Sequence, residues 1–418
     1  MSGPQGKNKW GGIISRLGQI PGDLLQMLKV KADTLIYSAK QAKTAQSLPL
    51  SSIAILRLEA SLKSQLYAPA ASAASLIHGD EILLERILTQ TDRDNRNNVT
   101  RTQAYWELYS ELPELHWALL AHMVSRNGGW TMTDLKGDLL PRLLSCRQTE
   151  DLFLFLERAN GLIFRDAFPQ LLLYKESKRI GRPLFHLLPR FSVSRWMEPV
   201  WNQFWDTKDS VLLTVSLIIN EQNYIEKRII QNLVYKKSVL DTLMFKAQSL
   251  LQLNQVVFPF QQERLNSRLA GLILEDFSDL DERIEFGKKL YAILFGLPDV
   301  HRGVLQFARR TPHTGSRADY RPDLFACIRK APHETKFQER LDGCKLNNGA
   351  EPFYSPRLAQ AWKDRRMDAI EPGDWFHNLK VLQHVRPIPV PFLFEMTGEY
   401  CLGLNKIELA ILAGETLR

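Results

Sequence analysis

Hydrophobic positions recur three and four residues apart along most of the chain, which is the spacing of an amphipathic helix. Apolar residues in this pattern predict a helix over residues 23–43, with lysines on its other face. Residues 149–176 and 194–276 are also predicted to be helical. No sustained alternation of apolar and polar residues occurs, and residues 390–396 are the clearest candidate strand. The predicted fold class is therefore all-α and multi-helical, with at most a short strand pair.

Capping signals set the expected helix boundaries near the first quarter of the chain. Thr100 and Gln103 have the spacing of a capping box, which predicts a helix start at Thr100. Pro113 is typical of a first helical turn and opens the next helix. Asn127-Gly128 predicts the end of that helix, because glycine readily adopts the left-handed conformation of a C-cap.

The texture of the chain changes near residue 311, where proline and glycine become frequent and long loops are expected. Three regions are predicted. Residues 1–45 form a basic, partly disordered or amphipathic N-terminal segment, residues 46–298 a helical core domain, and residues 299–418 a loop-rich C-terminal region packed on that core.

The net charge of +8 comes from two segments. Residues 1–43 carry seven basic and two acidic side chains, and residues 302–330 carry the same numbers. Both can be solvated segments, or they can meet an anionic partner. The candidate anion-binding surface consists of Arg302, Arg309, Arg310, Arg317 and Arg321. Residues 23–43 are also a candidate for peripheral membrane contact.

A polar loop over residues 92–101 is the most unusual local feature. It resembles a calcium loop but lacks the glycine and the bidentate glutamate that calcium needs. Two interpretations stay open: a loop that caps its neighbouring helices, or one wall of a pocket whose arginines bind a carboxylate or phosphate. The opposite wall would be a turn over residues 125–130. The candidate pocket residues are Arg93, Asn95, Arg96, Arg101, His116, His122, Arg126 and Asn127.

Two of these candidates, His116 and His122, are six positions apart on one predicted helix, so their directions differ by about 120° and they cannot easily share a metal. Each is either a hydrogen-bonded core residue or a group for proton transfer near neutral pH. His122 and Ser125 could touch, but nothing supplies the orienting acid of a hydrolase.

The common sequence motifs for nucleotide binding, hydrolysis and metal binding are missing. No P-loop, GxGxxG, GxSxG, HExxH or CxxC occurs, and His313, Cys327, His333 and Cys344 lack the close pairs usual for zinc. No metal site and no cofactor are therefore predicted. Four widely spaced cysteines favour a reducing compartment over a disulfide framework. With no apparent signal peptide or membrane span, the expected location is cytoplasmic.

Several strings, 98–105, 116–130 with 132–135, and 354–356 with 372–375, resemble a family of uncharacterised proteins from bacilli and related Gram-positive bacteria, known only as a domain of unknown function. The resemblance covers roughly residue 80 to the C-terminus. It implies a cytoplasmic bacterial protein and brings no activity, cofactor or partner.

Two classes of function remain open. The first is a non-enzymatic binding or scaffolding protein whose basic surface faces an anionic or protein partner. A nucleic acid is the less favoured partner, because no recognition module is identifiable. The alternative is an enzyme or small-ligand binder with the polar pocket described above. Whether the chain is an enzyme is left undecided.

Overall fold

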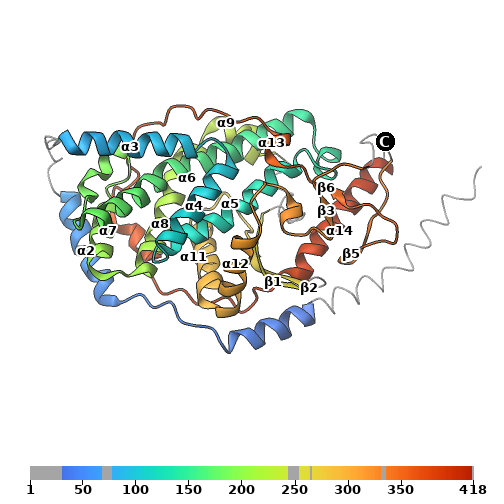
Figure 1. Ribbon diagram of the computed structural model, residues 1–418, viewed down its shortest axis with the longest axis horizontal. Helices are drawn as coiled ribbons and strands as arrows, with labels where there is room; N and C mark the ends of the chain where they lie inside the picture. The colour runs from blue at the N-terminus through green and yellow to red at the C-terminus, as the bar shows by residue number, and fades with distance from the viewer. Residues whose placement is uncertain (1–30, 68–77, 243–253, 264–265, 331–335, 417–418) are drawn as a thin grey trace, which may run out of the picture.

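The computed structural model describes residues 31–67, 78–242, 254–263, 266–330 and 336–416. Most of these residues are helical, as the ribbon shows (Figure 1). The predicted multi-helical fold is confirmed. The longer helices are α2 (Ser52–Tyr67), α3 (His78–Asp94), α4 (Asn98–Glu111), α5 (His116–Asp134), α6 (Cys146–Ile180), α7 (Met197–Thr207), α8 (Ser210–Ile225), α11 (Leu280–Gly296), α12 (Pro298–Arg310) and α14 (Thr397–Thr416).

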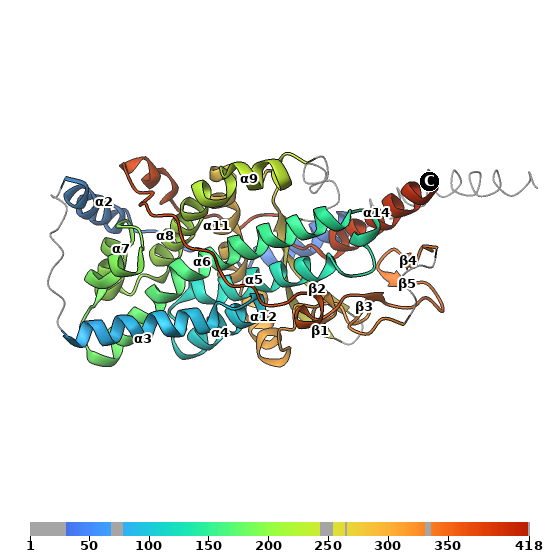
Figure 2. The ribbon, with the colours of Figure 1, turned by 90° about the horizontal axis from the view of Figure 1, so that it is seen from above.

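Helices α3, α4, α5 and α6 run along the long axis of the molecule in both views (Figures 1 and 2). Helices α2 and α7 lie at one end, and α14 lies at the other. One continuous hydrophobic cluster extends from Leu50 to Ile411, so elements from both ends of the chain share a core. The three-region division made from the sequence stays a prediction.

Short helical elements connect and extend the long helices. They are η1 (Leu140–Arg142), η2 (Phe185–Phe191), η3 (Glu226–Ile230), α9 (Leu233–Tyr235), η4 (Lys236–Leu240), η5 (Arg317–Asp319), α13 (Leu358–Ala361) and η6 (Leu379–His384). Two of them, η3 and η4, are π-helical turns that follow α8. Such turns interrupt the regular hydrogen-bond ladder and often accompany functional sites.

The boundaries predicted for α4 and α5 are wrong. Helix α4 begins at Asn98, two residues earlier than Thr100, because Asn97 is the N-cap and forms a reciprocal capping box with Thr100. Helix α5 begins at His116 and continues through Asn127 and Gly128 to Asp134. Residues 125–130 are therefore helical, not a turn.

Gly129 explains why the glycines of α5 mark a close approach and not a helix end. A Cβ atom at this position would lie 2.5 Å from Asn98 Oδ1 and 2.7 Å from the His313 ring. Real Cβ atoms do not approach other heavy atoms so closely, so only glycine allows α5 to pack against α4 and the segment after α12. Gly129 therefore reflects the close packing of α5, and these glycines do not mark its end.

Residues 255–263 and 266–273 are the paired strands of a hairpin where helix was predicted. Strands β1 (Gln255–Glu263) and β2 (Asn266–Ile273) pair antiparallel, with a register shift between Pro259 and Gln261. Helix α12 packs on β1, and Gly303 allows it to lie directly over the Phe260 carbonyl. The hairpin lacks a clear alternating pattern, since both of its faces are partly covered.

Two further strand pairs lie in the C-terminal region, so the described residues hold three pairs where at most one was expected. They are β3 (Phe325–Ala326) with β6 (Phe353–Tyr354), and β4 (Leu341–Asp342) with β5 (Lys345–Leu346). The strand predicted over residues 390–396 is reduced to one bridge, between Ala270 and Glu395.

A disulfide joins Cys344 to Cys401, with their Cα atoms 5.2 Å apart. It connects the end of the β4–β5 turn to α14. This one bond goes against the expectation from cysteine spacing, which favoured a reducing compartment over a disulfide framework. A pairing across 57 residues cannot be deduced from cysteine spacing alone.

Residues 31–42 are helical, within the helix predicted over residues 23–43, while residues 23–30 lie outside the described residues. This helix contacts the hairpin, because Arg268 stacks on the ring of Tyr37 at 4.0 Å. Its membrane-surface role stays a prediction. None of the described helices has the length and apolar character needed to cross a bilayer.

Candidate functional site

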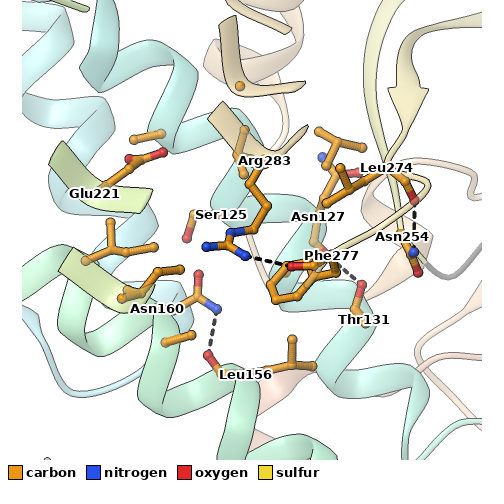
Figure 3. Close-up of a pocket in the computed structure, with 18 of the residues that line it drawn as sticks. Ser125, Asn127, Thr131, Leu156, Asn160, Glu221, Asn254, Leu274, Phe277 and Arg283 are labelled. Atoms are coloured by element: carbon orange, nitrogen blue, oxygen red, sulfur yellow. Dashed lines mark hydrogen bonds between the residues drawn. The ribbon is translucent and has the colours of Figure 1, made fainter. Parts of the chain in front are cut away.

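A cavity of about 300 Å³ lies between α5, α6, α8, α11 and the base of the β1–β2 hairpin (Figure 3). We call it the central cavity. Its wall is mostly apolar, and it includes Trp117, Leu120, Phe155, Ile225, Phe286 and Leu290. Polar side chains reach it at a small number of places, which is the usual composition of a small-molecule site.

A chain of hydrogen bonds runs along one wall of the central cavity. Trp117 Nε1 donates to Glu221 Oε2 at 3.1 Å, and Gln222 Nε2 donates to Glu221 Oε1 at 3.1 Å. Arg283 Nε in turn donates to Gln222 Oε1 at 3.0 Å and pairs through Nη2 with Glu226. The wall therefore carries an ordered polar stripe in an apolar setting.

Arg283 enters the cavity from α11. Figure 3 shows its guanidinium extending into the space ringed by the labelled side chains, with a hydrogen bond to the Phe277 carbonyl. That bond is 2.8 Å long, and the side chain is 2% exposed. Because Glu226 neutralises it, Arg283 does not leave a net positive charge in the cavity.

Glu221 is the most strongly perturbed acid of the cavity wall. Burial, helped by the Asp166 carboxylate, raises its pKa from 4.5 to about 8 against the two hydrogen bonds that lower it. The side chain lies deep in the molecule but keeps accessible surface, because it faces the cavity. At neutral pH most of this carboxyl is protonated.

Asp166 acts electrostatically on Glu221 and belongs to a polar network inside the core. Burial raises its pKa to about 7, while hydrogen bonds from Asn220 and Gln170 oppose that rise. Asn220 accepts from Trp375 Nε1 at 2.9 Å, and Gln170 accepts from Trp201 Nε1 at 2.8 Å. Asp166 Oδ1 has no hydrogen-bond partner in the described chain.

Two of the residues predicted from the sequence lie at the central cavity. Arg101 lines it and is held by bidentate hydrogen bonds to Glu157, at 2.8 and 2.6 Å. Asn127 also lines it, but its amide pairs with both the N–H and the C=O of Val257. Asn127 therefore fixes α5 to the hairpin in the manner of a β-ladder residue, which is a structural task.

The remaining pocket candidates lie elsewhere. Arg93 is exposed and pairs with Asp94, and Arg96 is exposed beside Asp364. Asn95 is buried, where it donates to the Gly161 carbonyl and accepts from Arg101. The structure does not bring these side chains together with those of residues 125–130.

Arg126 and the two candidate histidines also have structural partners. Arg126 donates to the Thr311 carbonyl and lies over Phe307. His116 stacks on Phe295, and burial lowers its pKa to about 4. His122 bonds to the Thr102 carbonyl, and burial lowers its pKa to about 3. Both imidazoles are neutral at pH 7, so they are poorly suited to proton transfer there.

The basic surface predicted from the sequence loses two of its five members. Arg317 is 3% exposed, pairs with Asp134 and stacks on Trp130, and Arg321 is 4% exposed and pairs with Asp323. Their guanidinium groups make these contacts inside the protein, so they cannot contact a partner at the surface. Arg302, Arg309 and Arg310 are exposed on α12.

No group of three or more potential metal ligands gathers within the described ranges. Cys344 is in the disulfide and Cys327 is free, while His333 lies outside the described residues. His313 is buried and bonds to Asn98 Oδ1 at 2.8 Å.

Sequence reasoning missed Glu221, Asp166 and Arg283. A signal for Glu221 was present, since the string Asn220-Glu221-Gln222 directly follows the apolar run over residues 211–219. A charged residue on a helix that is buried on most sides needs a partner or a purpose. Nothing in the string indicated that Arg283, 62 positions later, would share its wall.

Comparisons with known proteins agree with the sequence resemblance. The family model described as Protein of unknown function (DUF2515) matches residues 93–401. The uncharacterized protein YppC of Bacillus subtilis (strain 168) is 41% identical over 308 residues, which cover 72% of this chain and 93% of the relative. No solved structure matches the chain. The chain therefore belongs to the DUF2515 family of proteins of unknown function.

Proposed function

We propose that this protein binds a small, mainly apolar molecule in the central cavity. The observation that carries the proposal is the cavity itself, about 300 Å³ of space with an apolar wall and a polar stripe on one side. That volume is at the lower end of the range for ligand sites in proteins, roughly 300–1,000 Å³.

The cost of leaving the cavity empty supports a role for it in ligand binding. Protein interiors are close-packed, and an unfilled cavity of this size costs stability because its lining loses contacts. Apolar cavities bind apolar molecules readily, because water finds few hydrogen-bond partners there and is easily displaced. A ligand would restore the lost contacts and place its polar end on the stripe formed by Glu221, Gln222 and Arg283.

The experiment is a titration of the protein with octanol. Isothermal calorimetry measures the binding, and thermal unfolding measures the shift in the unfolding midpoint. A ligand that binds only the native state must raise that midpoint. At a free ligand concentration of 100 times Kd, the free energy of unfolding rises by about 2.7 kcal/mol. Ala121→Leu adds a branched side chain to the cavity wall and should abolish binding. Ala60→Leu makes the same change on the exposed face of α2 and should leave binding intact.

Two outcomes would contradict the proposal. One is no binding of octanol or of its matched amine and acid to the wild-type protein. The other is binding that survives Ala121→Leu unchanged, since the ligand would then occupy another place.

A scaffolding role through the basic surface is the second candidate, and the exposed positions of Arg302, Arg309 and Arg310 support it. Arg302 pairs with Asp299, and the other two lie in the last turn of α12, where they also complement the helix dipole. Binding of a polyanion that weakens steeply with salt, and that is lost in a double variant Arg309→Ala with Arg310→Ala, would support this role. The cytoplasmic location remains a prediction.

A further inference from the structure

Glu221 has a geometry that fits a ligand group. Both of its carboxyl oxygens accept hydrogen bonds from the protein, one from Trp117 and one from Gln222. These bonds fix the plane of the carboxyl at the cavity wall. A carboxylate has about four lone-pair sites, so acceptor capacity is left over for a group inside the cavity.

The charges around Glu221 leave its own charge uncompensated. Arg283 of α11 is separated from it by Gln222 and is neutralised by Glu226. Arg101 of α4 is neutralised by Glu157 of α6. Among the described residues, Glu221 forms no ion pair.

The other titratable groups that face Glu221 are acidic or neutral. Asp166 of α6 acts on it as a like charge, and Tyr105 of α4 is buried with its pKa raised well above 10 by desolvation. An ionised Glu221 would therefore add negative charge to an apolar space. A cation from outside the chain would remove this conflict.

We propose that the ligand of the central cavity carries a protonated primary amine, and that this ammonium group pairs with Glu221 while the apolar body of the molecule fills the cavity. The inference rests on the proposed function and names the chemical class of its ligand. An ammonium offers three donors, and Glu221 offers the acceptors that no described basic residue uses.

The proton balance follows from the two groups involved. A free alkylamine has a pKa near that of lysine, about 10.4, and is charged at neutral pH. Free Glu221 is mostly protonated at pH 7, because burial raises its pKa to about 8. Binding of the ammonium ionises the carboxyl, so one proton leaves to the solvent.

The experiment compares octylamine, octanol and octanoate, which share one apolar body. Calorimetry at pH 7 in buffers of different ionisation enthalpy counts the protons released. We expect octylamine to bind most tightly and to release close to one proton, while octanol releases none. The affinity for octylamine should rise about tenfold per pH unit from pH 6 to pH 8 and then level off.

Glu221→Gln is the matched variant, because the amide can still accept from Trp117 and keeps the shape of the side chain. It should weaken octylamine about 100-fold and abolish proton release, while octanol, which brings no charge to Glu221, should weaken far less. Glu107→Gln removes an exposed carboxyl on α4 and serves as the control.

The two proposals fail in different ways. If octanol binds in the cavity but octylamine binds no more tightly and releases no proton, the ammonium site is wrong and the cavity stands. If octanoate binds best, the head group is an anion and the inference is overturned. If none of the three binds, the proposed function itself is refuted.

Discussion

Replacing Glu221 by glutamine should stabilise the protein at alkaline pH and change little in acid. The pKa of Glu221 rises from 4.5 to about 8 on folding, mainly because burial penalises the carboxylate. Below pH 4.5 the group is protonated in both states. Between these two pH values the unfolded chain loses the proton first, so the stability of the wild type falls as pH rises.

The structure bounds the size of this effect. At about 1.4 kcal/mol per pH unit, the pKa rise corresponds to at most about 5 kcal/mol. The accessible cavity beside Glu221 admits screening that reduces the figure, so we expect on the order of 2–3 kcal/mol. The glutamine variant avoids the whole penalty while it keeps a hydrogen-bond acceptor for Trp117 Nε1.

Urea unfolding at pH 5 and at pH 8 measures the difference. The gap in stability between Glu221→Gln and the wild type should grow by a few kcal/mol from the lower to the higher pH. The surface variant Glu107→Gln controls for the loss of a negative charge. An equal gap at both pH values would refute the burial argument, and a variant that is less stable at pH 8 would show that the ionised carboxylate has a favourable partner.

Three further variants test other parts of the structure. Gly129→Ala should lower stability by about 1–3 kcal/mol because its Cβ would overlap Asn98 and His313, whereas Gly79→Ala, with open space around it, should not destabilise α3; thermal unfolding compares the two. Asn127→Ala should cost about 2–4 kcal/mol in urea unfolding, since it leaves the N–H and C=O of Val257 unpaired. Arg317→Ala should destabilise the protein by about 3–5 kcal/mol, because Asp134 would stay buried without its partner. Calorimetry should show that the variant binds a polyanion as the wild type does. A loss of that salt-sensitive binding without a loss of stability would support the surface role predicted for Arg317 from the sequence.

The helical character of the fold could be predicted, because amphipathic periodicity is a local property. The ends of α4 and α5 could not, since Asn97 and Thr100 both satisfy capping patterns and the choice depends on which neighbours are buried. The strand pair formed by residues 255–263 and 266–273 was missed for a related reason. Val257 and Phe258 are both buried, so the alternation that identifies a strand is lost.

The candidate site was only partly accessible to sequence reasoning. Arg101 and Asn127 were singled out as members of the polar loop and of the turn expected opposite it, and both reach the central cavity. Their tasks were not predictable, because the partners Glu157 and Val257 are 56 and 130 positions away. Charge counting failed for Arg317 in the same way, since a guanidinium that pairs with a buried carboxylate looks in the sequence like one that faces solvent.

The charged side chains in and around the cavity support one interpretation of its wall. Arg101 is paired with Glu157 and Arg283 with Glu226, so each buried cation has its own carboxylate. Glu221 and Asp166 are carboxyls that form no ion pair among the described residues, and the Asp166 carboxylate raises the pKa of Glu221. A purely structural wall could place a glutamine at position 221 and still hold Trp117, without the penalty of an acid near a second acid. An acid at the surface of an apolar cavity is useful where a cation is to be bound, because the same desolvation that destabilises the lone carboxylate strengthens its pairing with an incoming ammonium.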